Sequence, residues 1–239
     1  MTVAKRKRKI KKGKEKAVLQ RHPWVFSGAI QSGKKEGQEG GLVEVFDSEG
    51  DYLATGHFHH GTIMVRVISF EQRSIDQEFW NEKIAKAFAL RRVLDLPVLG
   101  LTDAFRLVHG EGDGLPGLIV DVYGDTAVVQ AHSAGMRLSL QQIATALQAV
   151  PNLGLNNIYD KSSEFSDQPT SHANGWLKGE GDETVIRENG NLFMVNWREG
   201  QKTGFFLDQR DNRALLAHYA NGQNVLNTFC YSGGFSMYA

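Results

Sequence analysis

The first third of the chain alternates between apolar and polar positions with a period of two. Runs of this kind cover 42–46, 52–58 and 63–69, separated by a polar turn and by a glycine. Alternation over short runs is typical of strands with one buried face. The pattern predicts a small closed β-barrel at this end of the chain.

Over 77–96 the apolar spacing changes to that of a helix. Ser74 or Asp76 can cap its start, and Pro97 ends it. Four basic residues of this helix are predicted to form a solvated face rather than an RNA-binding groove: Lys83, Lys86, Arg91 and Arg92.

Shorter runs separated by turns predict an α+β unit after this helix. The expected elements are a β-meander with strands at 105–110, 118–122 and 126–132, a helix at 138–150 and a strand at 156–159. A polar loop at 161–183, with room for a short strand, precedes a hairpin of 184–186 and 192–197 around an Asn-Gly turn.

Four acids of this unit lie in or beside glycine turns, where Asp is favoured for its local hydrogen bonds. Turn roles are therefore predicted, rather than an acid–base pair or a cation site, for Glu111, Asp113, Asp121 and Asp125.

Near the end of the chain, the apolar, β-prone run 224–230 leads into Tyr231-Ser232-Gly233-Gly234, and 235–239 has the character of a first helical turn. Glycines after a buried strand let the backbone approach a ligand, and a helix start offers free N–H groups. The unit predicts a site for a nucleoside-type cofactor. Two glycines are fewer than the three of the dinucleotide fingerprint, so the loop alone leaves a packing role open.

The preceding segment, 200–213, strengthens the functional interpretation. Asp208 is predicted to cap a helix at 209–220, with Asp211 as the acidic partner of a capping-box-like start. The helix is expected to present one apolar face, formed by Leu215, Leu216 and Tyr219.

Residues 201–213 together with 225–239 resemble the bacterial class I S-adenosylmethionine-dependent rRNA methyltransferases that carry an N-terminal PUA domain, including members related to the 23S rRNA cytosine-5 methyltransferase I. The resemblance extends more loosely over nearly the whole chain. It implies S-adenosylmethionine as cofactor and cytosine carbon 5 of large-subunit rRNA as target, with Asn227 standing where the family often has Asp. The residues that it implies for cofactor binding are Thr203, Phe205, Phe206, Asp208, Arg210, Asn227, Phe229, Tyr231, Gly233 and Gly234.

With this resemblance the expected fold class is α/β plus β, in three units. These are a PUA-like RNA-binding domain at 1–73, an α+β middle domain at 74–199, and the incomplete start of a doubly wound, Rossmann-like methyltransferase domain at 200–239. The catalytic cysteine and Asp-Pro-Pro-type motif of the family come later than residue 239. No catalytic residue is therefore assigned, the fragment is expected to be inactive, and Cys230 is expected to be a buried small hydrophobe.

Positive charge is concentrated at the start of the chain. Residues 1–21 hold ten Lys or Arg against one acid, a net +9, and the remainder carries −9 because the whole chain is neutral. Such a cluster attracts phosphate backbones, whereas a solvated tail would bind nothing in particular. The aromatic run 22–28 favours a segment that enters the fold. The residues predicted to bind RNA are Lys5, Arg6, Lys7, Arg8, Lys9, Lys11, Lys12, Lys14, Arg21 and Trp24.

The composition limits the classes of protein to which the chain can belong. The chain is 41% hydrophobic without an apolar run of membrane-spanning length, and its single cysteine leaves no intramolecular disulfide, which favours the cytoplasm. His57, His59 and His60 are predicted to mark a strand tip, not a metal site.

An RNA-binding module without activity and a nicotinamide-dependent oxidoreductase remain the alternatives to an rRNA methyltransferase. The oligomeric state, a homodimer included, stays open.

Overall fold

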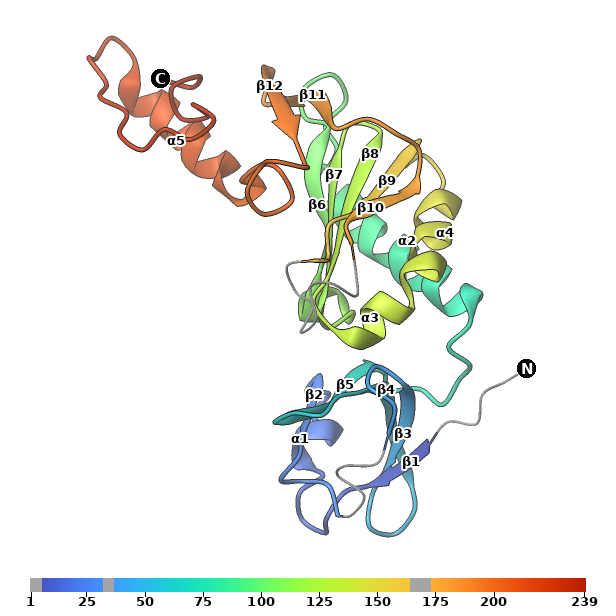
Figure 1. Cartoon of the computed structure of the whole chain (residues 1–239). Coiled ribbons are helices and arrows are strands. Elements are labelled where there is room, and N and C mark those ends of the chain that lie inside the picture. Colours follow the sequence, from blue (N-terminus) through green and yellow to red (C-terminus); the bar gives the residue numbers. More distant parts are fainter. Residues whose placement is uncertain (1–5, 32–36, 164–172) are drawn as a thin grey trace.

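The computed structural model describes residues 6–31, 37–163 and 173–239. Its N-terminal part is a five-stranded sheet with the order β1-β3-β4-β5-β2 (Figure 1). The strands are β1 (Arg6–Lys9), β2 (Trp24–Phe26), β3 (Leu42–Phe46), β4 (Tyr52–Phe58) and β5 (Ile63–Ser69).

Strand β1 pairs with β3 in parallel, and the other pairs are antiparallel. A bridge between Ile10 and Ile30 connects the chain just beyond the two outer strands. The short helix α1 (Lys16–Leu19) lies between β1 and β2 in the sequence. The alternating apolar positions fill the interior as predicted, with Val43, Val45 and Val65 almost fully buried.

A second five-stranded sheet, with the order β10-β9-β8-β7-β6, forms the centre of the molecule. Its strands are β6 (Ala104–His109), β7 (Leu118–Tyr123), β8 (Thr126–Ala131), β9 (Asn157–Asp160) and β10 (Gly175–Lys178). The helices α3 (Ala134–Leu138) and α4 (Leu140–Ala149) form the crossover that makes β9 parallel to β8. The predicted meander is confirmed; the predicted helix at 138–150 corresponds to α4, preceded by the short α3, and the predicted strand at 156–159 corresponds to β9.

The two faces of the central sheet have different partners. On one face, α2 (Gln77–Val93) and α4 cover a core that includes Leu118, Val120 and Val122 of β7 (Figure 1). On the other face, Tyr123 packs against the hairpin of β11 (Glu183–Glu188) and β12 (Asn191–Asn196). The alternation along β7 therefore sends Leu118, Val120 and Val122 to the helices, and Asp121 and Tyr123 to the opposite side.

Helix α2 confirms the predicted cap at its start. The Asp76 carboxylate accepts a hydrogen bond from the Phe79 N–H at 3.1 Å. The helix ends at Val93, earlier than predicted. Its Arg91 is buried and ion-paired to Asp113, so the prediction of a solvated face is wrong at this position.

The C-terminal arm differs most from expectation. It consists of the 3-10 turn η4 (Leu207–Gln209), α5 (Arg210–Ala220) and an irregular segment at 221–239 that projects from the rest of the molecule (Figure 1). The predicted buried strand at 224–230 is wrong: no strand forms there, and Leu226 and Phe229 are 87% and 101% exposed. A buried parallel strand needs neighbouring strands, and none of the described strands pairs with this run.

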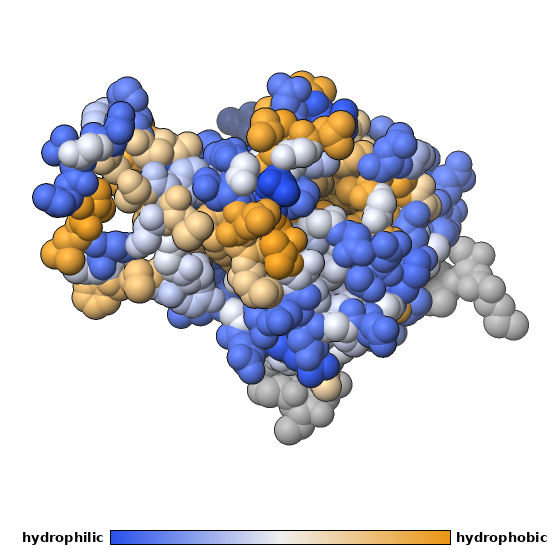
Figure 2. Space-filling view, turned by 90° about the horizontal axis from the view of Figure 1, so that it is seen from above, coloured by the Kyte–Doolittle hydropathy of each residue, from blue (hydrophilic) through white to orange (hydrophobic). Residues whose placement is uncertain are grey.

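Two predicted details of α5 also fail. Its N-cap position is Gln209, while the Asp208 carboxylate accepts bonds from Lys202 and Gln209 instead of from the helix N-terminus. The predicted apolar face is not covered, since Leu215 and Tyr219 are 56% and 69% exposed. Figure 2 shows apolar surface on this arm, at the left of the view.

The N-terminal and central units meet where β4 packs against α3. Gly135 lies so close to the His57 ring that a Cβ would stand 2.1 Å from Cγ. The same imidazole stacks on Trp80 of α2 with 6.5 Å between centroids. A glycine is required at this contact because any side chain would push the two units apart.

Candidate cofactor and RNA-binding sites

A buried polar network holds the segment that precedes η4. The Asp121 carboxylate, fully buried in β7, accepts two hydrogen bonds from the Arg106 guanidinium at 2.8 and 2.9 Å. It also accepts one from the Thr203 hydroxyl at 2.6 Å. Hydrogen bonding to Asp121 raises the pKa of Arg106. A buried carboxylate bound on both sides in this way fixes Thr203 against the sheet.

Further bonds continue this attachment along the segment. The Tyr123 hydroxyl accepts from the Phe205 N–H at 3.2 Å and lies 2.8 Å from the Thr203 hydroxyl oxygen. Burial raises the pKa of Tyr123. The buried Lys161 ammonium donates to the Gly200 carbonyl. Residues 200–205 are therefore tied to β7 and to the end of β9.

The prediction of turn roles for four acids is wrong for Asp121, which lies inside a strand. Asp113 belongs to η1 (Gly110–Asp113), and the Arg91 guanidinium pairs with it there. Glu111 accepts a hydrogen bond from the Trp24 indole at 2.8 Å. Asp113 and Asp125 also have the expected local roles, since the Asp113 carboxylate accepts from the His109 N–H at 2.6 Å and the Asp125 carboxylate accepts from the Thr126 hydroxyl at 3.2 Å beside the β7–β8 turn.

A second buried ion pair fastens the C-terminal arm to the hairpin. The Arg213 guanidinium of α5 donates two hydrogen bonds of 2.7 Å to the Glu188 carboxylate, and both side chains are almost fully buried. The Tyr238 hydroxyl lies 3.1 Å from the same carboxylate. Burial, together with the Glu188 charge, raises the pKa of Tyr238.

Several residues expected to bind the cofactor come together at the base of the arm. The Phe206 and Tyr231 rings meet edge to face at 5.4 Å, and the Tyr231 hydroxyl accepts from the Gln201 N–H at 2.8 Å. The exposed Asp208 lies beside them, bound to Lys202 at 3.3 Å. These groups form one wall on which a nucleoside could lie.

Other expected residues lie elsewhere. Thr203 and Phe205 are buried in the network and the core below this wall. Phe229 extends into solvent, and the Asn227 amide donates to the Ser236 hydroxyl at 2.7 Å. Arg210 is half-buried, 3.7 Å from Asp211.

The two loop glycines differ in their surroundings. Gly233 has φ +71°, in the left-handed region, and nothing lies within 4 Å of the place where a Cβ would be. At Gly234 a Cβ would stand 3.3 Å from Cδ of Arg213. Cys230, expected to be buried, is exposed.

The basic segment at residues 1–21 is exposed over most of its described length. Arg6, Lys7, Lys9, Lys11, Lys12, Lys14 and Arg21 are all exposed, whereas Lys5 lies outside the described residues. Arg8 differs from the other residues predicted to bind RNA, because it is buried with its guanidinium 5.0 Å from the centre of the Phe58 ring. Trp24 is half-buried, packed edge to face with Phe26 and His22.

The three histidines near the end of β4 have different surroundings. His57 is buried inside the strand, and the His59 ring, just beyond it, contacts the Glu39 carboxylate. Across 6–31, 37–163 and 173–239, no group of three or more His, Cys, Asp or Glu residues is arranged to hold a metal ion. No described helix is long and apolar enough to cross a membrane.

The sequence pattern predicts no role in the site for five charged residues of these buried networks: Asp121, Arg106, Glu188, Arg213 and Lys161. The available signal was a charge inside an apolar strand, as in Leu118–Tyr123, where Asp121 interrupts a run of β-branched and aromatic residues. A buried charge requires a partner, but the sequence does not say which of many arginines provides it.

Comparison with known families defines the class of protein. Residues 105–239 match a family model described as S-adenosylmethionine-dependent methyltransferase, and 9–70 match one described as PUA-like domain. The chain therefore belongs to the S-adenosylmethionine-dependent methyltransferase family and carries a PUA-like domain at its N-terminal end.

Similar curated proteins are named ribosomal RNA large subunit methyltransferase I. One from Pseudoalteromonas atlantica is 41% identical over 95% of this chain and 58% of its own length. One from Tolumonas auensis is 39% identical over 96% of this chain and 59% of its own length. The chain thus spans less than two thirds of the relatives that it matches.

Solved structures share the fold. A SAM-dependent methyltransferase from Streptococcus mutans superimposes with a TM-score of 0.76 at 23% identity, covering 97% of this chain and 59% of that one. The crystal structure of SMU.776, a methyltransferase complexed with SAH, gives a TM-score of 0.78 at 24% identity, with 97% and 58% coverage.

Proposed function

We propose that this chain forms the RNA-binding part and one wall of the cofactor site of an S-adenosylmethionine-dependent methyltransferase of large-subunit rRNA, acting in the cytoplasm on carbon 5 of a cytosine in 23S rRNA. The observation that carries the proposal is the 41% identity over 95% of the chain with a relative named for this reaction class. The proposed units are a PUA-like barrel at 1–73, a middle domain at 74–199 and the start of the methyltransferase domain at 200–239.

In this proposal S-adenosylmethionine, which supplies the methyl group, lies against Phe206, Asp208, Tyr231 and Gly233. Aromatic edges and a carboxylate suit a nucleoside, and the left-handed Gly233 leaves open space beside the backbone. The buried Asp121–Thr203 network positions this wall without touching the ligand. Carbon 5 of cytosine is a poor nucleophile and calls for a thiolate, a role that we do not assign to Cys230.

The exposed basic segment at residues 1–21 is the proposed RNA-binding surface. Lys11, Lys12 and Lys14 are exposed, and the aromatic group of His22, Trp24 and Phe26 follows them in the sequence; basic and aromatic side chains in one segment suit backbone contacts and base stacking. A non-catalytic RNA-binding module is the second candidate, because the exposed apolar arm leaves the cofactor wall open on one side.

RNA binding is tested by titrating a structured 23S rRNA fragment with residues 1–239 and with the triple variant Lys11→Gln/Lys12→Gln/Lys14→Gln. We expect weaker binding and a slope of log K against log salt reduced by about 1 for each phosphate that the variant no longer neutralises. An affinity that hardly changes with salt, or an unaffected triple variant, contradicts the RNA assignment.

Cofactor binding is tested by calorimetry. We expect residues 1–239 to bind S-adenosylmethionine weakly or not detectably, and to methylate nothing, because one wall is too little to enclose it. A chimaera that adds the part of the Pseudoalteromonas relative that this chain does not match should bind, and Gly233→Val should abolish that binding, since the positive φ of Gly233 strains a β-branched residue. Ser232→Ala is the matched control. Tight binding by 1–239, or no effect of Gly233→Val in the chimaera, removes the loop from the site.

A further inference from the structure

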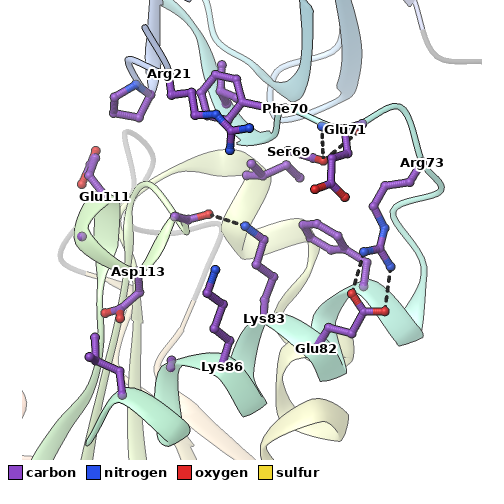
Figure 3. Close-up of a pocket in the computed structure, with 18 residues that line it drawn as sticks. Arg21, Ser69, Phe70, Glu71, Arg73, Glu82, Lys83, Lys86, Glu111 and Asp113 are labelled. Atoms are coloured by element: carbon purple, nitrogen blue, oxygen red, sulfur yellow. Dashed lines mark hydrogen bonds and ion pairs between the residues drawn. The ribbon is translucent and has the colours of Figure 1, made fainter. Parts of the chain in front are cut away.

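A cavity of about 570 Å³ lies between the N-terminal sheet and α2 (Figure 3). Its walls come from the end of β5 and the chain that follows, from α2, and from η1. A volume of this size suits a nucleotide-sized ligand. Of the residues predicted to bind RNA or cofactor, Arg21 alone lines it.

Most carboxylates around the cavity are already engaged. Glu82 accepts two hydrogen bonds from the Arg73 guanidinium at 2.6 and 3.0 Å. Glu111 accepts the Trp24 indole N–H, and Asp113 is held by the buried guanidinium described above. Glu71 is the acid that stays exposed at the edge of the cavity.

In contrast to these carboxylates, three cationic side chains of the cavity wall are not engaged in ion pairs with the described residues: Lys83, Lys86 and Arg21. Lys83 and Lys86 stand one helical turn apart on α2 and extend into the cavity, toward Arg21 of the N-terminal unit (Figure 3). Within the described part of the chain, none of the three forms an ion pair with a carboxylate at 4.0 Å or less. The closest partner of the Lys83 ammonium is the Gly114 carbonyl, at 3.5 Å.

The two lysines are also electrostatically unfavourable neighbours. Burial, and then the charge of Lys86, lower the pKa of Lys83. Like charges one turn apart destabilise a helix, and an anion placed between them would offset their repulsion. Arg21 faces them from the other wall, its guanidinium stacked 5.7 Å from the centre of the Phe70 ring.

We propose that this cavity binds a backbone phosphate of the RNA between Lys83 and Lys86 on one side and Arg21 on the other, an inference that rests on the proposed RNA-binding function. Arg21 is the last of the exposed basic residues at 1–21 and also lines the cavity, so the proposed RNA surface and the cavity share this residue. The cavity thereby connects the N-terminal surface to the central unit, and one phosphate contact would set the angle at which RNA crosses between them.

The test compares RNA binding by the whole chain with that of Lys83→Gln/Lys86→Gln and of Arg21→Gln. We expect the double variant to bind on the order of tenfold or more weakly at 0.1 M salt, with a salt slope reduced by one to two, and Arg21→Gln to show a smaller loss of the same kind. Arg92→Gln, on the same helix but not lining the cavity, is the matched control and should bind like the parent chain. Thermal melting checks that each variant is folded.

The outcomes separate the two proposals. If the parent chain binds the rRNA fragment and the double variant binds it equally well, the cavity is not the phosphate site, while the RNA-binding function stands. If the parent chain does not bind RNA, both fail. If inorganic phosphate or adenosine monophosphate binds the parent chain as tightly as RNA and loses affinity in the double variant, the cavity serves a free phosphate compound and the RNA assignment is overturned.

Discussion

His57 shows at the scale of one residue how burial changes chemistry. Its imidazole lies between Trp80 and Gly135, and burial lowers its pKa to about 4 from the ordinary 6.5. Between these two pH values the His57 ring therefore stays neutral in the folded chain but binds a proton in the unfolded chain. Stability contributed by the neutral ring is complete above pH 6.5 and is lost as the pH falls toward 4.

The corresponding prediction concerns the pH dependence of stability. His57→Gln should flatten the fall in unfolding free energy between pH 6.5 and 4, by up to about 3 kcal/mol across the window at ~1.4 kcal/mol per unit. Urea denaturation at several pH values measures this. His218→Gln, at an exposed position on α5, should leave the parental slope unchanged. Equal slopes for His57→Gln and the parent would show that His57 does not titrate in this range.

The role of Thr203 in the buried polar network depends on its hydroxyl group. Thr203→Val keeps the volume but removes the bond to the Asp121 carboxylate and the hydrogen bond with the Tyr123 hydroxyl. We expect the free energy of unfolding to fall by about 1.5–3 kcal/mol, as for other hydrogen bonds to buried charges, in urea denaturation. Thr203→Ser retains the hydroxyl and should recover most of the loss. A valine variant as stable as the parent would mean that the network does not hold this segment.

At the scale of elements, the contact of β4 with α3 depends on Gly135. Gly135→Ala would place a methyl group 2.1 Å from Cγ of His57, so the ring or the helix must move. Overpacking of this kind costs about 1–3 kcal/mol, which thermal or urea unfolding would measure.

A double-mutant cycle identifies the cause of that cost. His57→Ala should relieve much of the penalty of Gly135→Ala, because the two changes act on the same contact. Gly28→Ala is the control, since a Cβ at Gly28 meets nothing within 4 Å and no unusual φ is required there. Purely additive losses would show that the alanine clashes with something other than the ring.

At the scale of the whole molecule, the C-terminal arm depends on the Arg213–Glu188 pair. Arg213→Met would leave the fully buried Glu188 carboxylate with the Tyr238 hydroxyl as its remaining side-chain partner. Breaking a buried ion pair on one side costs about 3–5 kcal/mol, and here we expect the loss as release of the arm, seen as faster limited proteolysis within 210–239.

The pair can also be removed as a unit. Arg213→Met/Glu188→Leu should protect the arm better than Arg213→Met alone, because no buried charge is left without its partner. Proteolysis as fast in the double variant as in the single one would mean that the arm is held by the Arg213 guanidinium itself, through its contact 4.7 Å from the centre of the Phe205 ring.

The sequence by itself determined the features that depend on local rules. The alternation at 42–46, 52–58 and 63–69 predicted the N-terminal strands, and Asp76 predicted the start of α2. Asn189 and Gly190 both have positive φ, as a two-residue hairpin turn requires, so the turn residues alone predicted the β11–β12 hairpin. In each case the residues that make the structure are neighbours in the sequence.

The tertiary structure decided whatever depends on distant partners. Asp121 became the centre of a buried network because Arg106 and Thr203 reach it, and Arg213 is buried because Glu188 lies opposite. The run 224–230 has the composition of a buried strand but stays exposed, since burial requires neighbouring strands and not only apolar residues. Lys83 and Lys86 were expected to be solvated, and only the packing of α2 beneath the N-terminal sheet places them in a cavity with Arg21. Period and capping are encoded over a few residues, whereas charge pairing and burial are set by which surfaces the fold brings together.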